Sequence, residues 1–213
     1  MPPDSQRLVA VIVVIFTVEA GRLQVLLIKR SEEPHKDAWS LPGGRLNVGE
    51  SLLEAATRRL EIETGVKDVF LEQLYTFSNL DDAESVAVAY WALVDRPSVR
   101  LARRDEWRPA WNDTSELPGL AFRNDEVIHY ALARLRNKLA YSNVTYSLLP
   151  EEFSLSQLQQ TYEAILSRPL DKRNFRKRIL SLGILEPTGR HAGEGRHRPA
   201  QLYRFRERRP VML

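Results

Sequence analysis

Apolar and polar positions along the first half of the chain predict a buried β-sheet. Two runs, residues 8–18 and 23–29, are rich in β-branched residues and flank a plausible hairpin turn at residues 19–22. Residues 69–77 and 85–94 are further predicted strands, and the second is too apolar to lie at the surface. The first run is too short to span a bilayer, and no small-residue cleavage site follows it. We therefore interpret it as the first buried strand.

Helical spacing appears later in this half. Residues 124–139 predict a helix that closes a first domain, residues 1–140. The stripe expected to face the interior is Val127, Ile128, Ala131, Leu132 and Leu135. Residues 95–118 hold three prolines and two tryptophans, and we expect them to be irregular.

A shorter helix is predicted after an LPGG sequence. Ser51 is expected to cap its start, and Gly65 to end it in a left-handed conformation. Apolar residues recur at helical spacing between these two positions. They are Leu52, Ala55, Ala56, Leu60 and Ile62.

The last third of the chain predicts a separate unit, residues 141–213. Residues 154–167 form an amphipathic helix, and a basic helix covers residues 172–182. Two strands, 184–187 and 200–205, follow and are joined by TGRHAGEGRHR. Helix, turn, basic helix and hairpin is the order of a winged helix-turn-helix.

The basic helix has the pattern of a recognition helix. Phe175, Ile179 and Leu182 are expected to face inward while the cations point out, and such a helix fits the major groove of double-stranded DNA. We expect Arg173 and Asn174 to reach base edges and the other cations to hold phosphates. The candidate DNA-binding residues are Lys172, Arg173, Asn174, Arg176, Lys177 and Arg178 in the helix and Arg190, Arg196, His197 and Arg198 in the wing. The alternative is a basic winged-helix unit that contacts proteins.

The charge distribution supports a nucleic-acid partner. Residues 141–213 carry 13 Lys and Arg against 7 Asp and Glu, whereas residues 1–140 carry 18 against 21. A basic part joined to a mildly acidic part points to nucleic acid. The chain has no cysteine, which excludes disulfides and thiolate metal sites and suits the reducing cytoplasm. We expect a cytoplasmic protein with no membrane partner.

The most informative stretch is GGRLNVGESLLEAATRRLEIETGV, residues 43–66. It has the spacing of a Nudix box, the loop-helix-loop that grips a metal-bound diphosphate. The matching positions are Gly44, Glu50, Arg58, Leu60, Glu63, Gly65 and Val66. The alternative is an ordinary amphipathic helix with a solvated face, in which Glu54 and Arg58 form a surface pair.

Two positions depart from the box, because Arg59 and Ile62 replace glutamates of the metal site. Magnesium takes oxygen ligands, and neither residue supplies one. Arg59 is expected to pair instead with Glu63, one turn later. Glu50, Glu54 and Glu63 remain, so we predict weak or no magnesium binding, no catalytic residues and no bound cofactor.

The two halves together resemble the Nudix-related transcriptional regulators of the NrtR type. The resemblance covers nearly the whole chain and is most specific in LPEEFSLSQLQ, RPLDKRNFRKR and HRPAQLYRF. It implies an α/β/α Nudix sandwich with a mixed sheet, followed by a winged helix-turn-helix. It also implies a homodimeric repressor of genes for NAD biosynthesis and salvage, which binds operator DNA and releases it when ADP-ribose or a related metabolite binds the Nudix-like domain.

The resemblance also suggests where the effector binds. The candidate residues are Arg30, Trp39, Gly43, Gly44, Arg45, Glu63 and Tyr90. Trp39 and Tyr90 are equally compatible with the core. The segment NLDDAE, residues 79–84, is shorter and more acidic than in ADP-ribose-type relatives, which leaves the effector's identity open.

Two other functions compete with this one. The first is an ADP-ribose pyrophosphatase with an accessory basic domain, which the missing metal-site glutamates disfavour. The second is a regulator of the same family that senses a sugar, which the motif does not separate from an ADP-ribose sensor.

Overall fold

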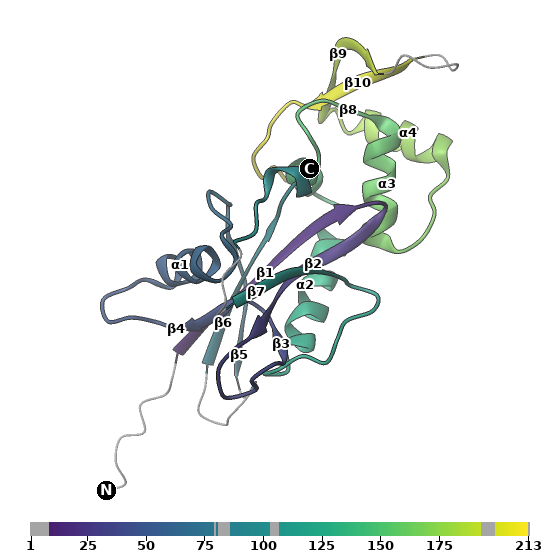
Figure 1. Cartoon of the computed structure of the whole chain (residues 1–213). Coiled ribbons are helices and arrows are strands. Elements are labelled where there is room, and N and C mark those ends of the chain that lie inside the picture. The colour runs from purple at the N-terminus through teal and green to yellow at the C-terminus, as the bar shows by residue number, and fades with distance from the viewer. Residues whose placement is uncertain (1–8, 79, 81–85, 103–106, 193–198, 213) are drawn as a thin grey trace, which may run out of the picture. The chain divides into compact units, whose positions relative to one another are not determined.

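The computed structural model describes residues 9–78, 80, 86–102, 107–192 and 199–212 (Figure 1). Its contacts divide the chain into two compact units. The first comprises the residues up to Thr17 together with Gln24–Leu132, and the second comprises Val18–Leu23 and Ala133–Leu213. No helix in the described part of the chain is long and apolar enough to cross a membrane.

The first unit is built on a mixed sheet, as predicted. Its strand order is β3-β2-β1-β6-β5, while β4 pairs with β1 and β7 pairs with β2. β1 and β6 are parallel, and the other pairings given for this sheet are antiparallel. The strands are β1 (Val9–Glu19), β2 (Arg22–Arg30), β3 (Trp39–Ser40), β4 (Gly43–Arg45), β5 (Glu72–Ser78), β6 (Val86–Leu93) and β7 (Trp107–Asp113).

The expectation that residues 95–118 are irregular was wrong. They contain a short 3-10 helix, Arg96–Ser98, and β7, which runs antiparallel to β2 with Pro109 opposite Ile28. β7 pairs with a single strand among those described. A proline cannot donate a backbone hydrogen bond, but an edge strand tolerates it. Pro109 therefore hid a strand that tertiary pairing stabilises.

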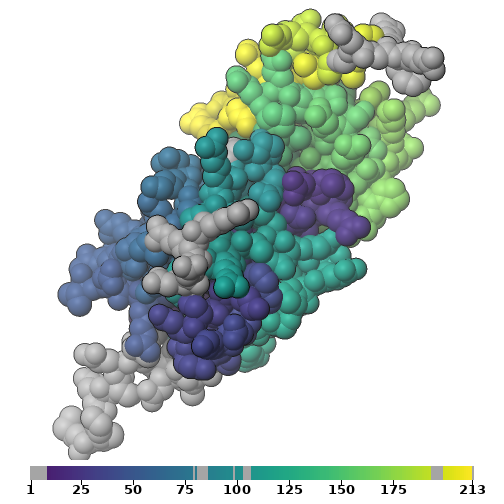
Figure 2. Space-filling view, viewed as in Figure 1, coloured from purple at the N-terminus to yellow at the C-terminus, as the bar shows by residue number. Residues whose placement is uncertain are grey.

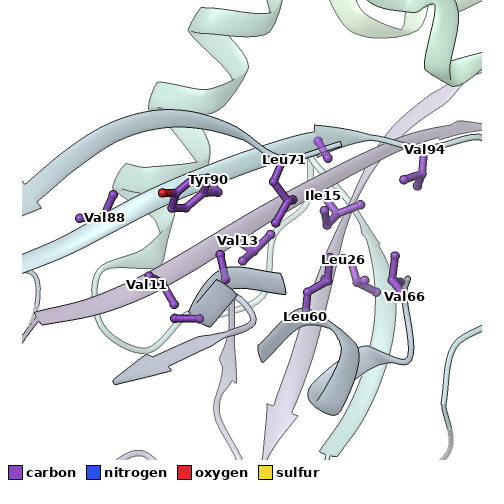
Figure 3. Close-up of a cluster of buried hydrophobic side chains, with 13 residues drawn as sticks. Val11, Val13, Ile15, Leu26, Leu60, Val66, Leu71, Val88, Tyr90 and Val94 are labelled. Atoms are coloured by element: carbon purple, nitrogen blue, oxygen red, sulfur yellow. The ribbon is translucent and has the colours of Figure 1, made fainter. Parts of the chain in front are cut away.

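The hydrophobic core of this unit lies between the sheet and α1 (Leu52–Thr64) (Figure 3). Alternate residues of β1, namely Val11, Val13 and Ile15, reach this core because side chains of a strand alternate between its faces. α1 contributes two small residues and Leu60. α2 (Asn124–Lys138) lies on the other side of the sheet (Figure 1), and all five residues of its predicted apolar stripe are buried.

Ile62, the last of the apolar residues at helical spacing in α1, is 37% exposed. Ala55, Ala56 and Leu60 already fill the face of α1 that meets the sheet, and Ile62 lies off that face because successive helical residues are about 100° apart.

The second unit has the predicted order of elements. α3 (Leu155–Leu166) and α4 (Lys172–Ser181) are followed by the paired strands β9 (Leu185–Ala192) and β10 (Ala200–Phe205). Two elements were not predicted. They are a 3-10 helix, Val144–Leu148, and β8 (Phe153–Ser154), which adds a third strand beside β10.

The core of the second unit joins its helices to this small sheet. The rings of Phe153 and Phe205 lie 5.1 Å apart, and those of Tyr162 and Phe175 lie 5.2 Å apart. Phe175 and Ile179 of α4 are buried as predicted, whereas Leu182 is half-buried because it already lies beyond the helix end. These contacts fix which face of α4 is left for solvent.

Candidate functional site

The glycine-rich loop before α1 lies directly against β1. β4 pairs with β1 so that Gly43 is opposite Ile12 and Gly44 is opposite Val11. A methyl group added to Gly43 would lie 2.3 Å from the carbonyl oxygen of Val11. The backbone approach is therefore too close for any side chain at Gly43.

α1 has the local structure that its sequence predicts. The Ser51 hydroxyl accepts a hydrogen bond from the Glu54 N–H, and the Glu54 carboxylate accepts one from the Ser51 N–H at 2.8 Å. This capping box satisfies N–H groups at the helix start. Gly65 ends the helix with φ of 80°, and its N–H donates to the carbonyl oxygen of Glu61.

Glu63 connects α1 to the glycine-rich loop. Its side chain is fully buried, and its Oε2 accepts a hydrogen bond from the Gly43 N–H at 2.9 Å. Its Oε1 lies 3.5 Å from Nη1 of Arg59, which confirms the predicted pair. At this distance the two groups form an ion pair, and Oε1 has no hydrogen-bond donor in the described part of the chain.

The Arg59 guanidinium lies against Gly44. A methyl group on Gly44 would be 2.5 Å from Cζ of Arg59, so the absence of a side chain leaves room for the cation. The Arg59 side chain is 27% exposed, but its Nε is buried and has no hydrogen-bond partner among the described residues. A buried polar atom left unpaired costs about 1–3 kcal/mol, so this arrangement is not an optimum for stability alone.

The other carboxylates of the box are engaged elsewhere. Glu50 accepts two hydrogen bonds from the Arg58 guanidinium, at 2.5 and 2.7 Å. This hydrogen bonding lowers the pKa of Glu50 to about 2. Glu54 is held in the capping box, so the alternative pair between Glu54 and Arg58 does not form.

The acidic residues of the box therefore already have partners within the protein. Arg59 and Ile62 offer no oxygen, and the oxygens of Glu50, Glu54 and Glu63 face donors or cations of the protein. Within the described ranges, no cluster of three acidic, histidine or cysteine residues could hold a metal ion. The glycine-rich loop and α1 thus enclose the guanidinium of Arg59, which lies against Gly44.

The remaining predicted effector residues lie in different surroundings. The Arg30 guanidinium donates to the Pro34 carbonyl oxygen at 2.9 Å. Arg45 is exposed at the end of β4. Trp39 is half-buried on β3. Tyr90 is 6% exposed and belongs to the hydrophobic core cluster (Figure 3). A core position was the alternative to a ligand contact for this residue.

One aromatic residue at this site was not predicted. The Phe122 ring lies 4.7 Å below the guanidinium of Arg30, a cation–π contact. Phe122 lies between two predicted elements and carries no motif, so the sequence pattern offered no signal for it. The acidic segment 79–84, apart from the buried Leu80, lies outside the described residues.

α4 supplies a second candidate site, for nucleic acid. Five of its six predicted DNA-binding residues are exposed, and Figure 2 shows this yellow-green segment at the surface. Arg176 is half-buried, and its Nε has no hydrogen-bond partner among the described residues. The exposed residues are Lys172, Arg173, Asn174, Lys177 and Arg178.

The turn before α4 is held by side chains that the sequence analysis did not single out. The Glu163 carboxylate accepts hydrogen bonds from the Leu170 N–H at 2.8 Å and from the Gln159 amide at 2.9 Å. The Gln159 amide also donates to the Leu170 carbonyl oxygen. Asp171 caps α4 by accepting from the Asn174 N–H at 2.8 Å. These bonds set the start of α4, the end expected to lie nearest the bases.

The predicted wing is described only in part. Arg190 on β9 pairs with Glu152 at 3.2 Å, and Arg204 on β10 pairs with Glu186 at 2.6 Å. Arg196, His197 and Arg198 lie outside the described residues. Arg190 and Arg204 of the wing are thus paired with glutamates. Within the described ranges, the exposed cations of α4 have no acidic partner.

Comparisons with known proteins identify both halves of the chain. Residues 6–135 match the family model of the NUDIX domain, and residues 145–205 match that of the NrtR DNA-binding winged helix domain. The ADPR responsive transcriptional repressor NtrR of Acinetobacter baylyi is 37% identical over 207 residues, which are 93% of this chain and 82% of the relative. The chain belongs to the NrtR family. This confirms the resemblance inferred from the sequence.

Solved structures of NrtR match at the level of the fold as well. Shewanella oneidensis NrtR complexed with a 27mer DNA has a TM-score of 0.79 and 33% identity, and the match covers 93% of both chains. The NUDIX domain of Shewanella oneidensis NrtR complexed with ADP ribose has a TM-score of 0.55 and 33% identity, covering 61% of this chain and 88% of that one. In this chain, the segment that matches the NrtR winged helix domain, residues 145–205, contains α4. The segment that matches the NUDIX domain, residues 6–135, contains Glu63.

Replacing Glu63 with glutamine is expected to flatten the pH dependence of stability. Burial raises the pKa of this carboxyl from 4.5 to about 7, so the folded protein binds the proton more tightly than the unfolded chain. The free energy of unfolding therefore falls as pH rises between these two values. Glutamine still accepts from the Gly43 N–H but does not titrate. Urea unfolding at about pH 5 and about pH 8 measures the difference, and equal losses in wild type and Glu63→Gln would contradict this account.

Proposed function

We propose that this chain is a DNA-binding transcriptional repressor whose Nudix domain binds ADP-ribose and thereby releases the DNA. The proposed domains are residues 1–140 for the effector and 141–213 for DNA. The observation that carries the proposal is the exposed face of α4, whose cations have no recorded acidic partner within the described ranges. Such a face binds the DNA backbone through counterion release.

The Nudix domain supports effector binding better than hydrolysis. A metal-dependent hydrolase needs carboxylates free to hold the ion that activates water and neutralises phosphate charge. Here Glu50, Glu54 and Glu63 are each engaged by neighbouring groups. The frame that would receive a diphosphate remains, so we propose a sensor without efficient hydrolysis. Control of NAD biosynthesis and salvage genes stays a prediction.

ADP-ribose is expected to weaken DNA binding. Fluorescence anisotropy of the purified chain on DNA from upstream of its own operon should show saturable binding at moderate salt. ADP-ribose should raise the apparent Kd by about tenfold, within the usual range of coupling between two ligands. Random DNA of the same length is the control, because non-specific binding follows salt alone. Binding that is specific but indifferent to ADP-ribose would contradict the proposed effector and favour a sugar or another nucleotide.

The α4 assignment is tested by the double variant Arg173→Ala/Lys177→Ala. Loss of one base contact and one phosphate contact is expected to weaken specific binding about tenfold to a hundredfold and to reduce the salt slope by about 0.9. The matched control is Arg100→Ala/Arg108→Ala, which removes two exposed cations of the first unit. Unchanged affinity in the α4 variant, or an equal loss in the control, would refute the recognition-helix assignment.

No efficient hydrolysis of ADP-ribose is expected. The chain is incubated with ADP-ribose and Mg²⁺ or Mn²⁺, and release of AMP and ribose 5-phosphate is followed by chromatography. An active Nudix hydrolase serves as the positive control. Turnover above the blank that disappears in Glu63→Gln would show that the box still works as a metal site.

A further inference from the structure

The Nudix box of this chain contains a cation where the consensus has a carboxylate. The guanidinium of Arg59 lies against Gly44, on the loop that frames the diphosphate. Its side chain is about one quarter exposed, at 27%. The cation is thus partly shielded from solvent and partly accessible to a ligand.

The surroundings of Arg59 hold it in this place. Nη1 lies 3.5 Å from Oε1 of Glu63, whose other oxygen is fixed by the Gly43 N–H. Gly44 has no side chain that would push the guanidinium away. Arg59 Nε and Glu63 Oε1 are buried without hydrogen-bond partners among the described residues, so the pair is not saturated by the protein.

We propose that Arg59 binds the diphosphate of the effector directly, in place of the divalent metal ion that a Nudix hydrolase uses. This inference rests on the proposed function, since it assigns how that ligand is held. Glu63 is then a positioning residue, which fixes Arg59 over Gly44 and has no contact with the ligand.

Guanidinium chemistry suits this role. A planar guanidinium presents several N–H donors and forms paired, charge-assisted hydrogen bonds with phosphate oxygens. It neutralises part of the phosphate charge. Unlike the metal ion of a hydrolase, it does not activate a water molecule. A site of this kind binds a diphosphate without a metal and leaves the phosphoanhydride bond intact.

Arg58, the neighbouring cation, does not serve the same purpose. Its guanidinium is held by the Glu50 carboxylate through two hydrogen bonds and also points Nη2 at the Arg45 carbonyl oxygen. Its charge is compensated by Glu50, and its Nε and Nη2 atoms already donate hydrogen bonds. Arg59 is the arginine of the pair whose donors remain available.

Isothermal titration calorimetry on the full chain tests the proposal with two probes, ADP-ribose and inorganic pyrophosphate. Wild type is expected to bind both in buffer that contains EDTA. Arg59→Gln should weaken both about tenfold to a hundredfold, as expected for the loss of charge-assisted hydrogen bonds. Arg59→Lys, which keeps the charge but loses the planar fork, should give an intermediate affinity.

Two further variants separate binding from folding. Gly44→Ala keeps every charge but places a methyl group where the guanidinium lies, so it should also weaken both probes. Lys67→Gln is the matched control: it removes a cation just beyond α1 that pairs with Glu61 at 2.5 Å and is 62% exposed. Its affinities should stay within about twofold of wild type, because an exposed pair contributes little. Thermal unfolding of each variant confirms that it is folded.

The outcomes distinguish the two proposals. Pyrophosphate binding that requires Mg²⁺, or that is unchanged in both Arg59→Gln and Gly44→Ala, overturns the role of Arg59. Wild type that binds pyrophosphate through Arg59 but does not bind ADP-ribose supports that role and contradicts the proposed effector. Wild type that binds neither probe overturns both.

Discussion

The hydrogen bond from the Gly43 N–H to the buried carboxylate of Glu63 is the contact on which the Nudix site depends. It joins the last turn of α1 to β4, and β4 is in turn paired with β1. Gly43 approaches the Val11 carbonyl oxygen so closely that it admits no side chain. Helix, loop and sheet are joined through this hydrogen bond and the pairing of β4 with β1.

This frame tolerates a change in chemistry because it does not itself depend on a metal. Glu63 bonds the backbone, Glu50 bonds Arg58, and Glu54 caps α1, so each acidic residue has a structural partner. Burying a carboxylate is costly unless it is paired, and Arg59 supplies the nearby positive charge. Arg59 thus places a positive charge 3.5 Å from the buried Glu63 carboxylate.

The sequence predicted the parts that local chemistry determines. The cap at Ser51, the left-handed end at Gly65 and the pair between Arg59 and Glu63 depend on residues close together in the chain, and each prediction was confirmed. β7 was missed because Pro109 obscures a strand that pairing with distant β2 stabilises. Phe122 and Arg30 are 92 positions apart in the chain, and no periodic sequence pattern predicts their contact. Tyr90 illustrates the same limit, since only the packed core decides between a buried ring and a ligand contact.

The two candidate sites lie in different electrostatic surroundings. The cations of α4 are exposed, so their interactions with DNA are screened by salt. Arg59 is largely shielded and lies beside a buried carboxylate, where screening is weaker and geometry counts for more. An exposed cationic face suits a long polyanion whose affinity comes from many similar contacts. A single guanidinium fixed against a glycine suits one small anion of defined shape. An effector can shift the equilibrium of a repressor only by binding one state of the protein better than the other.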